Sequence, residues 1–302
     1  MIARHFPGSV AAPFGTEAGP TIVETGATVK FTGVKGSTTQ LIKAYLDEEF
    51  RLAGRGVTEE GVELGSLCLA AENNKGGNYV QLGKITLMAD TLLTAPKVND
   101  GDRGGSGNYG YFYFAAGKKF DMGGFTMESK CTGNAELRCD QIVNPGHFVS
   151  SGSGVFYIGT GAKFDHGPTH TITLASGAAL DFYNNALAGG FNWTVVCEAT
   201  TSKINFYKSL TFDGNIEIDA GCTCTITASS LAIRMTGDIS GAGSLVLVSS
   251  TELHLAGNNT YTGTTSGGTV YIASPTAIPD YSLSENAGAE DMRKTAVRAM
   301  KD

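Results

Sequence analysis

Oxygen-bearing side chains with the spacing of a calcium site occur between residues 97 and 108. Asn99, Asp100 and Asp102 lie close together in a glycine-rich run, KVNDGDRGGSGN. Ca²⁺ binds hard oxygen ligands of this kind at alternating positions. The run lacks the acidic residue that completes a helix–loop–helix calcium site. The competing interpretation, which we favour, is a solvated loop that leaves the fold.

Two histidines flank a turn further along the chain. His166 and His170 follow Asp165 in KFDHGPTHT, and on a helix their spacing would place both imidazoles on one side. Gly167 and Pro168 exclude a helix here, which weakens the case for a metal site. Asp165 and His166 are retained as candidates for binding a ligand from a turn.

Acidic residues recur at one place in a short repeated unit. Asp121, Asp165 and Asp181 each follow an apolar residue. Pairs of carboxyl groups can cleave polysaccharides by acting as acid and base, and the turns of a β-solenoid can present such groups. The spacing of these three aspartates is uneven, so it does not place them on successive turns. We therefore predict surface solvation for this set in preference to catalysis.

Aromatic residues gather in YGYFYF, residues 109–114. If Phe112 and Phe114 face a core, strand alternation turns Tyr111 and Tyr113 outward. Exposed tyrosines on a flat sheet can stack on sugar rings, whereas tyrosines under a neighbouring loop only pack. Tyr111 and Tyr113 are therefore candidates for binding a glycan.

The motifs of common catalytic sites are missing from the sequence. It has no G-x-S-x-G nucleophile turn, phosphate-binding loop or H-E-x-x-H helix, so we assign no catalytic residue and expect no cofactor. Lys and Arg total 22 against 29 Asp and Glu, without a long basic run, which argues against nucleic acid as a partner. No apolar run is long enough to predict a membrane-spanning helix.

The six cysteines follow no C-x-x-C spacing, and a chain of 302 residues needs no disulfide framework. Cys222 and Cys224 stand two apart in a strand pattern, so their side chains share one face with Ile218 and Ile226. We predict that they are buried thiols that fill core space.

A glycine-led unit repeats along the chain and predicts the fold that positions these side chains. A glycine and two further residues precede alternating apolar residues, as in GKKFDM and GCTCTI. The unit begins at Gly26, Gly117, Gly161, Gly177, Gly221, Gly243 and Gly268. The interval from Gly221 to Gly243 is 22, and the intervals from Gly117 to Gly161 and from Gly177 to Gly221 are each twice as long. A unit of this length with short strands predicts a β-solenoid, whose coils bury their apolar faces against one another.

The clearest copy of this pattern runs from residue 239 to 279. Its segment LHLAGNNTYTGTTSGGTV contains Gly257, Asn258, Asn259, Thr260, Tyr261, Thr262, Gly263 and Gly268. This order resembles the autotransporter-associated β-strand repeat, also called the passenger-associated transport repeat. The hallmark of that family is L-x-L-x-G-x-N-T-Y-T-G-x-T followed by G-G-T-L. The resemblance implies a right-handed parallel β-helix of the pectin-lyase-like type in an exported protein, and it assigns these eight residues to the repeat's structure.

The chain divides into three parts. Residues 1–25 are predicted to form a lead-in or N-terminal cap, residues 26–279 the β-solenoid, and residues 280–302 a polar helical tail or linker. Residues 39–53 space their apolar side chains as a short helix would, so we predict a helical insertion or cap there. The segment 1–25 lacks the pattern of a signal peptide, whereas the repeat resemblance implies export. We therefore expect a piece of a longer exported polypeptide or a truncated gene product, and the alternative is a non-exported protein that has acquired the repeat.

Together these patterns predict a non-enzymatic bacterial β-solenoid that is secreted or displayed at the cell surface. It would act as a passenger or adhesin-like structural or binding module, with host or cell-surface glycans or proteins as partners. One alternative is a polysaccharide-active or glycan-binding β-helix of the pectate-lyase type. A further alternative is a phage tailspike-like fibre, which would form an obligate trimer.

Overall fold

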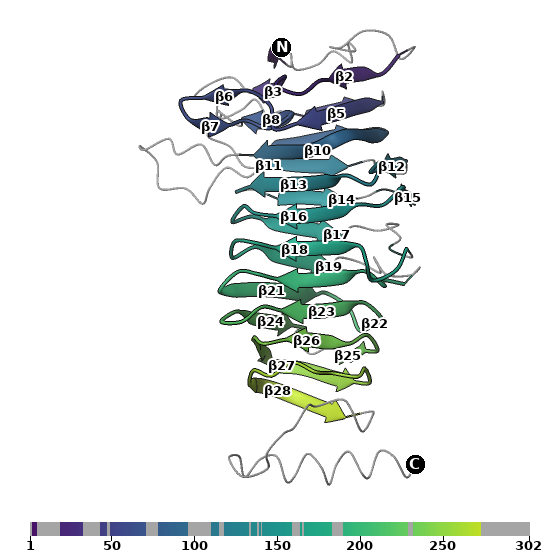
Figure 1. The fold of residues 1–302 in the computed structure, drawn as a ribbon, viewed down its shortest axis with the longest axis vertical. Helices are drawn as coiled ribbons and strands as arrows, with labels where there is room; N and C mark the ends of the chain where they lie inside the picture. Colours follow the sequence, from purple (N-terminus) through teal and green to yellow (C-terminus); the bar gives the residue numbers. More distant parts are fainter. Residues whose placement is uncertain are drawn as a thin grey trace. The chain divides into compact units, whose positions relative to one another are not determined.

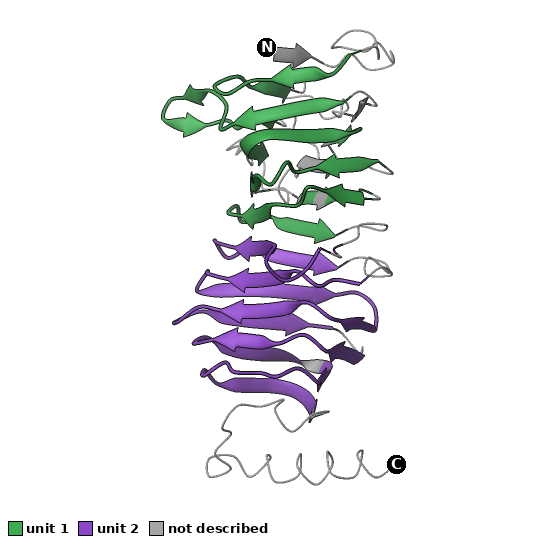
Figure 2. Ribbon diagram, turned by 45° about the vertical axis from the view of Figure 1, so that its right-hand side comes forward, with its two compact units in different colours: residues 1–163 green, residues 164–302 purple. Residues whose placement is uncertain are grey.

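The computed structural model describes residues 2–4, 19–32, 43–46, 49–70, 78–95, 110–114, 118–132, 134–137, 139, 141–158, 164, 166–182, 190–228 and 232–272. The chain forms two compact units, residues 1–163 and residues 164–302, and each unit is described by itself (Figure 2). Every regular element of the described residues is a β-strand. Within that part of the chain, no helix is long and apolar enough to cross a membrane.

Unit 1 is built from strands that pair in parallel, apart from the antiparallel β6–β7 hairpin (Figure 1). Its strands are β1 (Ile2–Arg4), β2 (Thr21–Val23), β3 (Val29–Thr32), β4 (Lys43–Leu46), β5 (Phe50–Gly54), β6 (Thr58–Glu59), β7 (Val62–Glu63), β8 (Leu67–Ala70), β9 (Asn78–Leu82), β10 (Ile85–Ala95), β11 (Gly110–Phe114), β12 (Lys119–Asp121), β13 (Thr126–Cys131), β14 (Asn134–Leu137), β15 (Gln141–Val143), β16 (His147–Ser150) and β17 (Val155–Ile158).

Two sheets run along unit 1. One follows the order β1-β3-β8-β10-β13-β16, and the other follows β4-β9-β11-β14-β17. The coil that joins β3 to β8 is long. Thr28 and Gly65, which are hydrogen-bonded to each other just before these neighbouring strands, lie 37 residues apart in the sequence. The coil that joins β13 to β16 is shorter, since Ser151 bonds to Glu128 across an interval of 23. The extra residues of the longer coil include the β6–β7 hairpin, called the β-arm below (residues 56–63).

Unit 2 has the same parallel construction with more regular coils (Figure 1). Its strands are β18 (Thr171–Leu174), β19 (Ala179–Phe182), β20 (Thr194–Cys197), β21 (Thr201–Phe206), β22 (Leu210–Phe212), β23 (Asn215–Ile218), β24 (Thr223–Thr227), β25 (Ala232–Met235), β26 (Ile239–Gly241), β27 (Ser244–Leu255) and β28 (Thr265–Ile272). One sheet follows β18-β20-β23-β26. In the other, β27 pairs through its first half with β24 and through its second half with β25.

The register in unit 2 measures the length of one coil. Ala179, Lys203, Thr225, Val246 and Ser266 are successive Cα partners. Side-chain hydrogen bonds between successive coils span an interval of 24 from Asp181 to Asn205 and of 20 from Ile239 to Asn259. The β-solenoid that the glycine spacing predicts is confirmed, and the coils of unit 2 have about the predicted length.

Alternation along the strands fills the inside of the coils with apolar side chains. In β24, Cys224 and Ile226 are buried, while Thr223 and Thr225 lie half-buried on the other face. Phe182 and Phe206 are Cα partners, and their rings stack with centroids 5.1 Å apart. Burying each such side chain contributes about 1.5–3 kcal/mol, so the internal columns stabilise the stack of coils.

All six cysteines are free and buried, as predicted for Cys222 and Cys224. Burial raises the pKa of the Cys131 thiol to about 12, despite a hydrogen bond from Ser129. The thiol therefore stays protonated at neutral pH and serves as packing.

The helix predicted over residues 39–53 is wrong, because strands β4 and β5 occupy that region. Phe50 and Leu52 are both fully buried, as the two-residue period of a strand requires. The pairing of β5 with β2 and β10 buries alternate residues, and this tertiary context overrides the local helical spacing.

The structure describes part of the predicted lead-in at one end of the solenoid but not the predicted tail at the other. Within the predicted lead-in of residues 1–25, β1 pairs with β3 and β2 pairs with β5. Strand pairing therefore begins before residue 26. The predicted tail, residues 280–302, lies outside the described residues.

Candidate functional site

The repeat-like segment of residues 257–268 bonds to the coil that precedes it. The Asn259 side chain is 3% exposed, and its Oδ1 accepts a hydrogen bond from the backbone N–H of Ile239 at 2.7 Å. The backbone N–H of Asn258 donates to Asp238 Oδ1, also at 2.7 Å. The bond between Asn259 and Ile239 satisfies a buried amide oxygen and a buried N–H, and it holds this turn on the coil before it.

The Thr-Tyr-Thr part of the motif continues the same contact. The backbone N–H of Thr260 donates to the carbonyl of Ile239 at 2.8 Å, and that of Thr262 donates to the carbonyl of Gly241 at 3.0 Å. Tyr261 is 2% exposed, and its hydroxyl is hydrogen-bonded to Thr265 Oγ1. The Tyr261 ring therefore fills the inside of the coil.

The motif glycines stand where neighbouring backbones approach too closely for a side chain. A Cβ on Gly257 would lie 2.1 Å from the carbonyl oxygen of Gly237, and one on Gly263 would lie 2.0 Å from that of Gly243. Gly268 combines a close contact with a left-handed φ of 51°. Every residue of the motif described in these paragraphs thus has a structural role in stacking one coil on the previous coil.

Of the two glycan-binding candidates on β11, the structure describes the side chain of Tyr113 but only the backbone of Tyr111. Tyr113 is half-buried and pairs with Gln81 of β9 and Glu136 of β14. The backbone of Tyr111 pairs with Tyr79, and its side chain lies outside the described residues. A glycan contact at these two tyrosines stays a prediction.

The predicted metal and turn residues are mostly beyond the described residues. Asn99, Asp100, Asp102 and Asp165 all lie there. His166 is exposed, and its ring centroid lies 6.4 Å from that of His170 in an edge arrangement. Among the described residues, no three His, Cys, Asp or Glu side chains are grouped to hold a metal ion.

Two of the recurrent aspartates are described, and their environments differ. Asp121 Oδ1 accepts a hydrogen bond from the Gly123 N–H within its own turn and another from Asn144 Nδ2, 23 residues away, both at 3.0 Å. Asp181 is instead 2% exposed. The surface solvation predicted for the set is therefore wrong for Asp181, whose carboxyl group is buried and bonded to side chains of the next coil.

Asp181 is held by two donors from the next coil. Asn205 Nδ2 donates to Oδ1 at 2.6 Å, and the Tyr207 hydroxyl donates to Oδ2 at 2.9 Å. Burial raises the pKa of Asp181, while these hydrogen bonds oppose part of the rise. A buried carboxyl group with a raised pKa beside a partly exposed tyrosine is a candidate for binding or acid–base chemistry. The sequence signal, an aspartate after an apolar residue, did not distinguish it from a surface aspartate.

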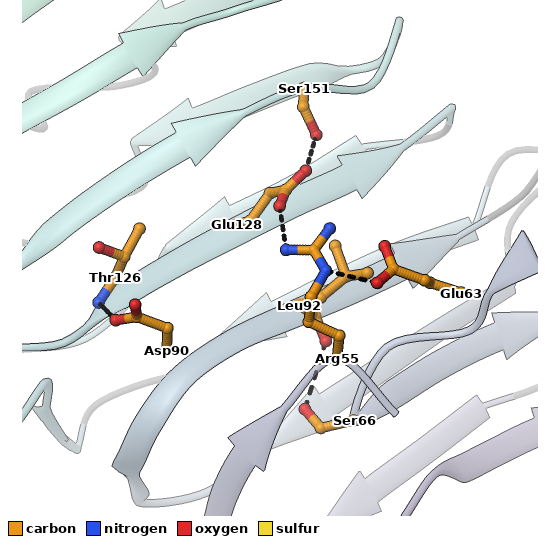
Figure 3. A network of polar contacts seen from close by, with 8 residues as sticks. All are labelled: Arg55, Glu63, Ser66, Asp90, Leu92, Thr126, Glu128 and Ser151. Carbon is orange, nitrogen blue, oxygen red and sulfur yellow. Dashed lines mark hydrogen bonds and ion pairs between the residues drawn. The ribbon is translucent and has the colours of Figure 1, made fainter. Parts of the chain in front are cut away.

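A charged network on unit 1 was not foreseen from the sequence (Figure 3). Arg55 Nε donates to Glu63 of the β-arm at 2.7 Å, and Arg55 Nη1 donates to Glu128 of β13, also at 2.7 Å. Ser151 donates to the other oxygen of Glu128. The hydrogen bonds to both glutamates raise the pKa of Arg55, and the bond from Arg55 lowers the pKa of Glu63. Arg55 and Glu128 are 73 residues apart along the sequence, so only the coiled fold brings them together.

The base of the β-arm is also fixed by buried contacts. Thr28 Oγ1 donates to the carbonyl of Gly65 at 2.7 Å and accepts from the Val57 N–H at 2.9 Å. Leu64 clusters with the buried side chains of Cys68 and Ala70. The Arg55 network therefore braces a hairpin whose base is already anchored, which is a structural role.

Comparison of the chain with protein-family models, curated proteins and solved structures gave no match. The likeness to the passenger-associated repeat thus stays a prediction carried by residues 257–268.

Proposed function

We propose that this chain is a non-enzymatic β-solenoid of an exported bacterial protein, which acts by displaying its outer faces as a passenger or adhesin-like module. The observation that carries the proposal is the role of the repeat-like residues. Asn259, Tyr261 and Gly263 each contact the coil before them or fill its interior, which is the role expected of a passenger repeat.

The outward positions are suited to display. Between the buried Leu253 and Leu255, His254 is half-buried, and its ring stacks on Tyr271 of the next coil with centroids 4.5 Å apart. Outward residues of a parallel coil can change without disturbing the interior, because the two faces of a strand alternate. Such a scaffold presents long columns of side chains to a partner.

Labelling of intact cells tests the proposal. In the organism that encodes the chain, an antibody to unit 2 should label unbroken cells or the culture medium, while an antibody to a cytoplasmic enzyme should label only lysed cells. Labelling of the chain that requires lysis would overturn the proposal.

The Asp181 site favours a second candidate, a polysaccharide-active β-helix, because its carboxyl group is buried and its pKa is raised. Incubation of the purified chain with polyuronates, with and without Ca²⁺, would then release unsaturated oligosaccharides. Product that disappears in Asp181→Asn would favour the enzyme over the display module.

A further inference from the structure

Three polar side chains stand in a row along the outward face of β21 and the residue that follows it. Lys203, Asn205 and Tyr207 alternate with the buried Ile204 and Phe206. Tyr207 is 49% exposed, although burying its aromatic ring would be energetically favourable. Tyrosine is enriched at binding interfaces, because its ring is apolar while its hydroxyl forms hydrogen bonds.

Asp181 of the preceding coil fixes two of these three side chains. Its two oxygens accept separate hydrogen bonds from Asn205 Nδ2 and the Tyr207 hydroxyl, at 2.6 and 2.9 Å. Asn205 still has a second N–H group and its carbonyl oxygen for an outside partner. Because Asn205 and Tyr207 are positioned before a ligand arrives, binding loses less side-chain entropy.

Lys203 supplies a positive charge at the other end of the row. Its side chain is exposed, and its partners on the adjacent coils are the smaller Ala179 and Thr225. The ion pairs between described residues all lie in unit 1, so Lys203 pairs with no described carboxylate. The outward carboxylate of Glu217 belongs to β23, in the other sheet. An anion can therefore approach Lys203 in an otherwise acidic chain.

We propose that Lys203, Asn205 and Tyr207, which span about 13 Å of extended chain, form a binding subsite for a short stretch of an acidic polysaccharide that contains uronate residues. The ammonium group of Lys203 would pair with the sugar carboxylate, and the amide of Asn205 would bind a hydroxyl group. The exposed ring of Tyr207 would pack against the apolar face of the sugar. The inference rests on the proposed display function, which would expose this face of the chain outside the cell.

Affinity electrophoresis of the purified chain through gels that contain alginate, a polyuronate, tests the subsite. We expect retardation by alginate and none by neutral dextran. Tyr207→Ala should weaken binding about three- to tenfold through loss of the ring contact. Lys203→Gln should weaken binding similarly and reduce its sensitivity to salt. Lys119→Gln, which removes an exposed lysine from β12 of unit 1, is the matched control and should bind as the unmodified chain does.

Several outcomes would overturn the subsite. They are absence of alginate binding, full binding by both Tyr207→Ala and Lys203→Gln, and equal retardation by dextran sulfate, which would show that charge alone suffices. If Lys203→Gln melts at the same temperature as the unmodified chain, its weaker binding is not caused by unfolding. Surface labelling of intact cells is independent of this test, so a failed subsite leaves the display proposal standing.

Discussion

Replacing Gly263 with alanine should destabilise unit 2 because two coils meet at this residue. The added Cβ would lie 2.0 Å from the carbonyl oxygen of Gly243, whereas ordinary contacts begin near 3.4 Å, so the coils must separate locally. That shift breaks the hydrogen bonds from Thr262 to Gly241 at 3.0 Å and from Thr264 to Ser244 at 3.1 Å. Two lost hydrogen bonds at about 1 kcal/mol each, with about 1 kcal/mol of overpacking, give about 3 kcal/mol.

Substitutions at two other glycines distinguish backbone strain from close contact between coils as the cause of a loss in stability. Gly221 has a left-handed φ of 78° and open space around it, so Gly221→Ala should cost only about 1 kcal/mol of backbone strain. Gly19 has neither a left-handed φ nor a close neighbour, so Gly19→Ala should change stability by less than about 0.5 kcal/mol. Urea unfolding followed by circular dichroism measures all three. If Gly263→Ala costs no more than Gly221→Ala, the close stacking of coils at the motif is refuted.

Three further predictions concern polar residues. Because the pKa of Asp181 is raised in the folded chain, the stability it contributes is present below its ordinary pKa of 3.8 and is lost as pH rises through the folded value. Asp181→Asn should therefore melt above the unmodified chain at neutral pH and lose that advantage in acid; an advantage that grows in acid would contradict this. Glu128→Ala should cost about 1 kcal/mol or less, since the Arg55 pair is partly solvated, yet it should speed protease cleavage within the β-arm, whereas Glu217→Ala should not. Glu60 sits at a φ of 51° in the two-residue turn of the β-arm, so Glu60→Asn should stabilise by about 0.5 kcal/mol in the same urea assay, and a loss would argue against a type I′ turn.

The fold was predictable from unit 2, where the strands of successive coils pair at a nearly constant spacing. Successive Cα partners are 22 residues apart from Lys203 to Thr225 and 21 apart from Thr225 to Val246, close to the predicted unit, and Cys224 and Ile226 keep the strand period. Residues 39–53 were misassigned because their short strands place apolar side chains at spacings that a helix also uses, and only pairing with β2 and β10 decides between the two.

The candidate site was harder to predict because its residues meet across coils. Asp181 and Tyr207 are 26 residues apart, and nothing local to Asp181 indicates that a tyrosine hydroxyl and an amide converge on it. Arg55 likewise reaches Glu128 over 73 residues. Contacts between successive coils span an interval of 37 at Thr28 but only 20 at Asn259. Because the coil length varies, the partner of a given residue cannot be predicted by adding one fixed repeat length to its number.

The repeat-like segment forms one coil that is stacked in register on the coil before it. Paired cysteines on the outer face test this stacking directly, because Thr225, Val246 and Ser266 are successive Cα partners. Neighbouring strands lie about 4.8 Å apart, within reach of a disulfide, and alternate strands lie about 9.6 Å apart, beyond it. Under mild oxidation, Thr225→Cys with Val246→Cys and Val246→Cys with Ser266→Cys should cross-link, and Thr225→Cys with Ser266→Cys should not. Cross-linking of the third pair in preference to the second would contradict the stacked coil.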